Sequence, residues 1–429
     1  MIGAGGMRLT AMSAPQKAPH SMPQTKTPRD RSFGFSSTVV SLFLTKFRDF
    51  ALPACVWAVL VTMGSWQARA DTATPPPQMV LAAPMALQTA AATSAADLAG
   101  GPNAGAPADS AAAKKTPLTP VNAAWTQVLN QIVSDPPPPH LVRGTHYVIS
   151  NEDRHDLWKK TIDNLGGAYI GVGTDQNYVL AGWQKPELLV LFDFDQVVVN
   201  LHYVYRVFFI QANTPDEFRS LWETKNEATA MRLLAEAYPH PKQRAAIVEA
   251  YKMSRYSVLA RFRKVAGIYQ IHKIPWFMTD LDQYAHVSQL FRAGRVVMVR
   301  GDLTVGRSLQ SIADALTSLG VKLKVLYLSN AERYWTYTEG FRKSVLALPY
   351  AEAALVFRTR ARPNGVYMYV VQDAQNFQQW VSHPKVNTVY QVTHQLEADP
   401  NPGLFHIKKL PGPTVPQIPH PASAHLKSK

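Results

Sequence analysis

Cysteine is almost absent from this chain of 429 residues, in which Cys55 is the only one. If the leader described below is removed, the mature protein has no thiol, which excludes a disulfide framework and a cysteine metal site and suits an oxidising compartment. The sequence also lacks a Gly-x-Ser-x-Gly elbow, a His-Glu-x-x-His helix, a Walker loop and a calcium-binding loop. These absences exclude the enzyme and binding classes built on those four motifs.

A dense run of lysine and arginine with interleaved aromatics is also missing, although the net charge is +14. The first 70 residues carry eight of the 44 basic side chains and two of the 30 acidic ones, so the rest of the chain has a net charge of +8. This moderate excess predicts general attraction to anionic surfaces and no specific binding of nucleic acid.

The amino-terminal 70 residues have the three parts of a secretory signal peptide. A basic stretch over 1–49 precedes an apolar run over 50–66, and Ala68-Arg69-Ala70 follows. This pattern predicts cleavage after Ala70 and a periplasmic or secreted protein. Because 17 apolar residues are at the low edge of what spans a bilayer, an uncleaved anchor in the inner membrane is the alternative. Both interpretations predict membrane contact through this segment.

Aromatic residues are missing from 71–120, where alanine, proline, serine and threonine dominate. Such a composition cannot bury a core, so we expect a disordered linker there. The proline-rich, basic stretch 411–429 is expected to be a disordered tail. The folded domain is therefore predicted to cover 121–410.

Within this domain, apolar strands alternate with helices. Gly166-Gly167 ends an expected helix over 151–164, and a long helical stretch over about 196–290 separates the second strand from the third. This order predicts an α/β domain with three layers, a doubly wound and mostly parallel sheet, and a helical insertion after the second strand. The other expected helices cover 177–184, 308–319 and 341–347, and the strands cover 168–172, 187–192, 295–300, 323–328, 354–359 and, last, 365–371.

Glycines and polar side chains follow the first four expected strands. They are Gly171 and Gly173 with Asp175 and Asn177, then Asp193 and Asp195, then Gly301-Asp302, and finally Ser329-Asn330. In an open α/β sheet a ligand binds at the carboxyl ends of the strands, where the strand order reverses. We therefore expect a small-molecule ligand in that crevice, roofed by the helical insertion.

These landmarks resemble those of class I S-adenosylmethionine-dependent methyltransferases. In particular, the stretches 167–178 and 301–335 resemble a bacterial family of unknown function with a methyltransferase-like, Rossmann-like fold. Two positions depart from the methyltransferase pattern. Tyr169 stands where an acid is usual, and Asp175 stands where a third glycine is usual.

The resemblance implies S-adenosylmethionine as cofactor. Gly171 and Gly173 would then let the cofactor approach the backbone, and Asp175 and Asn177 would complete the site in the same turn. Asp193 or Asp195 would accept hydrogen bonds from the ribose. The resemblance also implies that Asp302 faces the adenine, and that Asn330 and Tyr334 lie beside the transferred methyl group. No residue is assigned to a metal.

Other interpretations of the same residues remain open. The glycines can simply form a tight turn, Asp175 and Asn177 can cap the crossover helix, Asp195 can cap the next helix, and Asp302 and Asn330 can cap loops. Asp193 and Asp195 also match the first motif of haloacid-dehalogenase-like phosphatases, although their later lysine and acidic pair are missing. Because S-adenosylmethionine is not expected outside the cytoplasm, an exported ligand-binding or scaffold protein without catalysis is the first alternative, and the phosphatase is the second.

Overall fold

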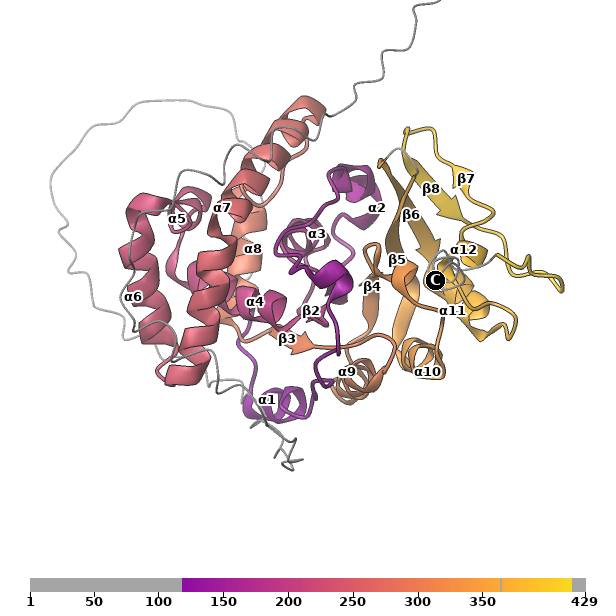
Figure 1. Ribbon diagram of the computed structural model, residues 1–429, viewed down its shortest axis with the longest axis horizontal. Helices are drawn as coiled ribbons and strands as arrows, with labels where there is room; N and C mark the ends of the chain where they lie inside the picture. The colour runs from indigo at the N-terminus through magenta and orange to yellow at the C-terminus, as the bar shows by residue number, and fades with distance from the viewer. Residues whose placement is uncertain (1–117, 363–364, 419–429) are drawn as a thin grey trace, which may run out of the picture. The chain divides into compact units, whose positions relative to one another are not determined.

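The computed structural model describes residues 118–362 and 365–418 (Figure 1). The predicted leader and nearly all of the predicted linker lie outside these residues. Eight strands of the described part form one sheet, in the order β3-β2-β1-β4-β5-β6-β8-β7. The strands are β1 Ala168–Val172, β2 Leu188–Asp193, β3 Val296–Arg300, β4 Leu323–Tyr327, β5 Tyr350–Ala361, β6 Tyr367–Asp373, β7 Glu397–Ala398 and β8 Leu404–Ile407.

Strands β3, β2, β1, β4 and β5 are parallel to one another. The order reverses at β1, which pairs with β2 on one side and with β4 on the other. This is the doubly wound arrangement in which ligands bind beside the reversal point. The predicted mostly parallel sheet is thus confirmed. The strand expected over 365–371 is present as β6, which pairs antiparallel with β5. It is not the last strand, because β8 and β7 follow it at the edge of the sheet.

Helices cover both faces of the sheet. Tyr169 and Leu189 belong to a core shared with helices of the insertion, whereas Ile170 and Val190 belong to a core on the opposite face. Because successive strand residues point to opposite faces, a strand buried on both sides must be apolar throughout, as β1 and β2 are. The structure therefore has the predicted three layers. The first face carries α3 Gln176–Gln184, α4 Gln196–Gln211, α7 Pro241–His272 and α8 Leu281–Arg292, and the second carries α1 Ala123–Leu129, α9 Arg307–Ser318, α10 Glu339–Ala347 and α11 Ala374–Ser382.

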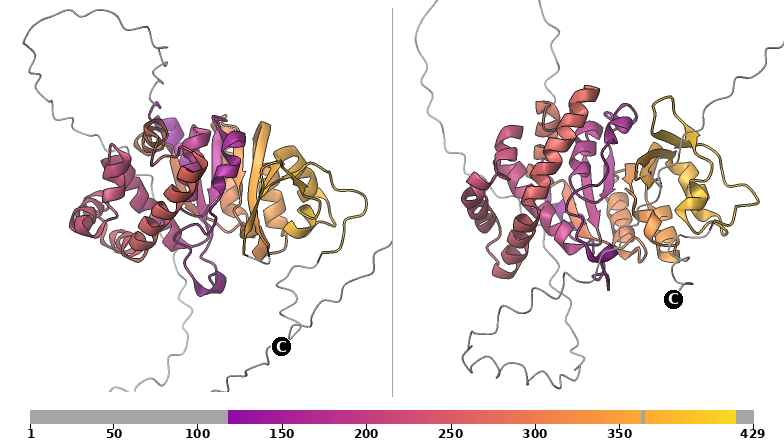
Figure 2. Two further views of the ribbon diagram at one scale, coloured as in Figure 1. Left: turned by 90° about the horizontal axis from the view of Figure 1, so that it is seen from above. Right: turned by 45° about the horizontal axis from the view of Figure 1, so that its top comes forward.

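The connection from β2 to β3 is the predicted helical insertion. Helix α4 packs against β2 and β3, and the chain then forms α5 Pro215–Ser220, the short helix η3 Thr224–Asn226, α6 Glu227–Ala237, α7 and α8. Its aromatic side chains form the core, with the rings of Phe209 and Phe218 stacked 4.3 Å apart. Figures 1 and 2 show these helices on one side of the central strands and β6, β8 and β7 on the other.

Three details differ from the sequence-based expectations. The helix expected over 151–164 begins only with η2 (His155–Trp158) and continues as α2 (Lys159–Ile162), because Glu152 turns inward to the sheet. The helical pattern beyond Pro215 is interrupted at Ser220. Residues 411–418, assigned to the tail, contain the buried Val415. Of the helices in residues 118–362 and 365–418, none is both long and apolar enough to cross a membrane.

Candidate functional site

A cavity of about 260 Å³ lies at the carboxyl ends of β1, β2, β3 and β4. Each of these strands contributes the residues that directly follow it, which is why segments far apart in the sequence meet here. Among the predicted site residues, six line the cavity, namely Gly173, Asp193, Asp195, Asp302, Asn330 and Tyr334. The other three, Gly171, Asp175 and Asn177, do not.

The two glycines after β1 have different roles. Gly173 has a φ of +94°, which favours glycine, and lies in the cavity wall. Gly171 lies behind the wall, where a Cβ atom would come within 2.1 Å of Asn177 Oδ1. That oxygen accepts a hydrogen bond of 2.7 Å from the hydroxyl of Tyr169. Gly171 therefore allows close packing beneath the turn. A Cβ atom at Gly173 would meet the side chain of Gln176, so this glycine also allows close packing, but its backbone lines the cavity.

Asp175 and Asn177 brace the turn from inside the protein. Asp175 accepts from the Ser150 amide at 2.7 Å and pairs with Arg261 Nε at 3.0 Å. It occupies the capping position of α3, but its side chain does not cap the helix. Asn177 donates to the carbonyl groups of Val172 and Thr174. The side chains of Asp175 and Asn177 therefore stabilise the turn and do not line the cavity.

The two acids after β2 are also distinct. Asp193 ends the strand, and burial together with the charge of Asp195 raises its pKa to about 7. Asp195 is the cap of α4, as the sequence suggested, because its Oδ1 accepts from the Val197 amide at 2.9 Å. Its Oδ2 lies 2.8 Å from His146 Nδ1. Asp193 also accepts a backbone hydrogen bond, from the Asp195 amide to its Oδ1 at 2.9 Å, and both acids line the cavity.

Asp302 and Asn330 follow β3 and β4. Asp302 Oδ1 accepts from both the amide and the hydroxyl of Thr304, at 2.8 and 2.7 Å, so the loop-capping alternative holds while the residue also lines the cavity. Asn330 Nδ2 donates to the Tyr367 hydroxyl at 3.1 Å. Burial raises the pKa of Tyr334 further above its ordinary value of 10.0, so its phenol is a hydrogen-bond donor at neutral pH. In the part of the chain that the structure describes, no group of three or more His, Cys, Asp and Glu could hold a metal ion.

The roof of the cavity comes from the segment 138–151, which sequence reasoning did not assign to the site. Its first end is fixed by the buried Asp135, whose Oδ2 accepts from the Asp302 amide at 2.9 Å. Its other end is fixed by the bond between Ser150 and Asp175. The expected roof of insertion helices is therefore wrong, since Val198 is the single lining residue from the 196–290 stretch. The feature of the sequence that marks the start of this segment is the run of four prolines at 136–139.

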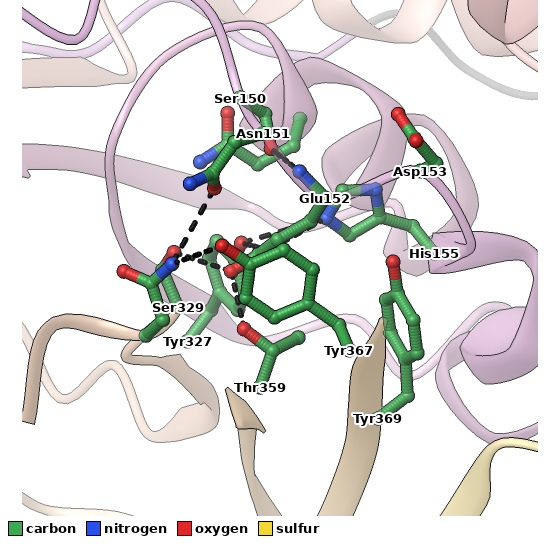
Figure 3. Close-up of polar contacts among 12 residues, drawn as sticks. Ser150, Asn151, Glu152, Asp153, His155, Tyr327, Ser329, Thr359, Tyr367 and Tyr369 are labelled. Carbon is green, nitrogen blue, oxygen red and sulfur yellow. Dashed lines mark hydrogen bonds and ion pairs between the residues drawn. The ribbon is translucent and has the colours of Figure 1, made fainter. Parts of the chain in front are cut away.

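A buried carboxylate joins the roof to the sheet (Figure 3). Glu152 is fully buried, and its Oε1 accepts from Ser329 Oγ at 2.7 Å and from the Thr359 hydroxyl. Its Oε2 accepts from the Tyr327 hydroxyl and lies 3.0 Å from His155 Nε2. Burial alone would raise the pKa of Glu152, but the hydrogen bond and charge of His155, with the bonds from Thr359 and Tyr327, bring it below its ordinary value. This cluster holds the wall at Ser329 against the roof.

The comparison with known proteins identifies the family. A family model described as a domain of unknown function, DUF7790, matches residues 147–408. The chain belongs to this family. The matched part runs from the roof to the edge strand β8 and contains all four strand ends that meet at the cavity. No similar sequence was found among curated proteins.

Proposed function

We propose that the cavity binds S-adenosylmethionine and that this DUF7790 domain transfers the methyl group to a small molecule. One observation carries the proposal. Gly173, Asp193, Asp302 and Asn330 come from the ends of four parallel strands, β1 to β4, and all line one cavity beside the reversal point of the sheet. The methyltransferase resemblance assigns these same four positions to the cofactor and the reacting methyl group.

The residues present fit the ribose and the methionine part of the cofactor. Gly173 offers its backbone to the cavity, in a conformation with a φ of +94° that favours glycine. With a pKa of about 7, Asp193 can exchange hydrogen bonds with a diol in either of its protonation states. Phe194 and Leu303 add apolar surface to the wall, which suits a purine ring.

The acceptor would be held at the β4 end of the cavity. When bound, S-adenosylmethionine supplies an electrophilic methyl group, and the electron pair of the broken carbon–sulfur bond stays on sulfur as the acceptor atom forms its new bond. Tyr334 stays protonated and can donate a hydrogen bond that orients the acceptor. Asn330, positioned by its bond to Tyr367, offers an amide at the same place.

An exported ligand-binding protein is the second candidate function. It is favoured by the signal-peptide pattern together with two structural details, the occupied Oδ1 of Asp302 and the presence of Tyr169 beneath the turn. The phosphatase alternative is less well supported. Asp195, the acid/base of that motif, has both carboxylate oxygens engaged, one by the Val197 amide and the other by His146.

Calorimetric titration of the full chain with S-adenosylmethionine and S-adenosylhomocysteine tests the proposal. We expect both to bind, and we expect Asp193→Ala to weaken both at least about tenfold through loss of the ribose contact. Asp216→Ala is the matched control, because this acid is exposed on α5 in the insertion. Absence of heat for both ligands with the wild type would refute cofactor binding and leave the ligand-binding candidate.

A further inference from the structure

The cavity is asymmetric in charge. All three acids that line it, Asp193, Asp195 and Asp302, follow β2 and β3. The β4 end is lined instead by aromatic and neutral side chains, among them Tyr147, Tyr334 and Trp335. A ligand that spans the cavity therefore meets negative charge at one end and a flat, apolar wall at the other.

Arginines lie next to residues of this aromatic end, although none of them is among the side chains that line the cavity. The guanidinium of Arg333 lies 5.3 Å from the centre of the Tyr334 ring, and that of Arg360 lies 4.6 Å from the centre of the Tyr390 ring. Arg143 belongs to the roof segment and stands in the sequence between the lining residues Val142 and Thr145. The short helix η4 (Ala331–Tyr334), which carries Arg333, contacts α12 (Val389–Val392), which carries Tyr390. The segments that carry the three arginines therefore meet at this end of the cavity. Burial raises the pKa of Tyr334, and the charges of Arg333 and Arg143 oppose that rise.

These three positive charges lack an acidic counterpart. Within residues 118–362 and 365–418, Arg143, Arg333 and Arg360 form no ion pair. The nearest acid in the sequence, Glu332, is buried and paired with Arg358 at 2.6 Å. Arg333 and Arg360 are half-buried and Arg143 is exposed. Neighbouring arginines without a carboxylate partner favour a bound anion, since the planar guanidinium matches the geometry of a carboxylate or phosphate.

We propose that the methyl acceptor of this site is a planar molecule with an anionic group, a carboxylate or a phosphate monoester. The ring would lie against Tyr334 and Trp335, and the anion would be held by Arg333 with Arg143 on the roof and Arg360 behind it. The role of this molecule as methyl acceptor rests on the proposed function, whereas the preference of the site for an anion does not.

The test compares charged and neutral probes of the same shape. Benzoate, phenyl phosphate and benzamide would be titrated into the full chain and followed by ligand-observed NMR, with and without S-adenosylhomocysteine. We expect at least one anionic probe to bind about tenfold or more tightly than benzamide, as one charge-assisted contact allows. If benzoate binds more tightly than phenyl phosphate, the anionic group of the natural ligand is a carboxylate; the reverse order indicates a phosphate monoester.

Substitutions assign the preference to the arginines. The quantity compared is the affinity for the anionic probe divided by the affinity for benzamide. Arg333→Gln and Arg143→Gln should each reduce this ratio to about threefold or less, whereas Arg333→Lys should retain part of the preference for the anion. Arg295→Gln is the matched control, because its guanidinium also lies over a ring, 4.8 Å from the centre of Trp125, before the amino end of β3. We expect this control to keep the full ratio.

Two results would overturn the proposal. One is equal binding of all three probes to the wild type, and the other is a preference that survives both glutamine substitutions. Arg143→Gln is informative even if Arg333→Gln disturbs folding, since Arg143 is exposed on the roof. Failure of S-adenosylhomocysteine to bind would refute the proposed function alone, because the preference is measured in its absence as well.

Discussion

Replacing Glu152 by glutamine tests whether the buried cluster holds the cavity together. The carboxylate accepts four hydrogen bonds, from His155, Tyr327, Ser329 and Thr359. A charge-assisted bond contributes roughly 1 kcal/mol more than a neutral one, so neutralising the acceptor of four bonds costs about 4 kcal/mol. Burying an amide is less costly than burying a carboxylate, which offsets part of this loss. We expect Glu152→Gln to lower the free energy of unfolding by about 2–4 kcal/mol at pH 7.

Urea denaturation measures this difference, and its pH dependence has a definite sign. Because the pKa of Glu152 is lowered in the folded state from an ordinary value of 4.5, the stabilisation is present above that value. It is lost as the pH falls through the folded pKa, so the two proteins should converge in acid. Glu236→Gln is the control, since the ion pair of Glu236 with Arg232 is exposed and contributes less than about 1 kcal/mol. A Glu152→Gln variant as stable as the wild type at pH 7, or a difference that does not shrink in acid, would refute the reasoning.

Three further predictions concern the cavity and its support. Gly173→Ala should cost about 1–3 kcal/mol in urea because of its φ of +94°, and should weaken S-adenosylhomocysteine in calorimetry; unchanged values of both would contradict the assigned role. Because the pKa of Asp193 is raised to about 7, its own contribution to stability falls as the pH rises from about 4 to 7. His202, with a pKa lowered to about 4, contributes the opposite slope in both proteins, so Asp193→Asn should gain stability relative to the wild type over this range in urea titrations. Arg358→Met should cost about 3–5 kcal/mol by leaving Glu332 buried and unpaired, and a second substitution Glu332→Gln should restore most of it; an additive double variant would argue against the pair.

Local patterns in the sequence were sufficient for the first six strands of the sheet and for part of the site. The strand over 168–172 was predicted with its observed bounds, and the cap at Asp195 was named, because apolar runs, glycine turns and caps depend on neighbouring residues. The convergence of Asp193, Asp302 and Asn330 also followed from sequence, since parallel strands bring their carboxyl ends to one edge.

Long-range contacts decided the rest. Which way Asp175 points depends on Arg261, 86 residues away, and this contact turns a predicted ligand residue into a brace. Glu152 accepts a hydrogen bond from Thr359, which is 207 residues away in the sequence. Because this contact turns Glu152 toward the sheet, the first turn of the expected helix does not form, and the preceding segment lies over the cavity as its roof. The sequence by itself thus determined the strands β1 to β6 and the edge of the sheet at which their polar residues gather. Only the tertiary structure decided the edge strands β7 and β8 and which side chains line the cavity, because burial and pairing depend on neighbours that the sequence does not place side by side.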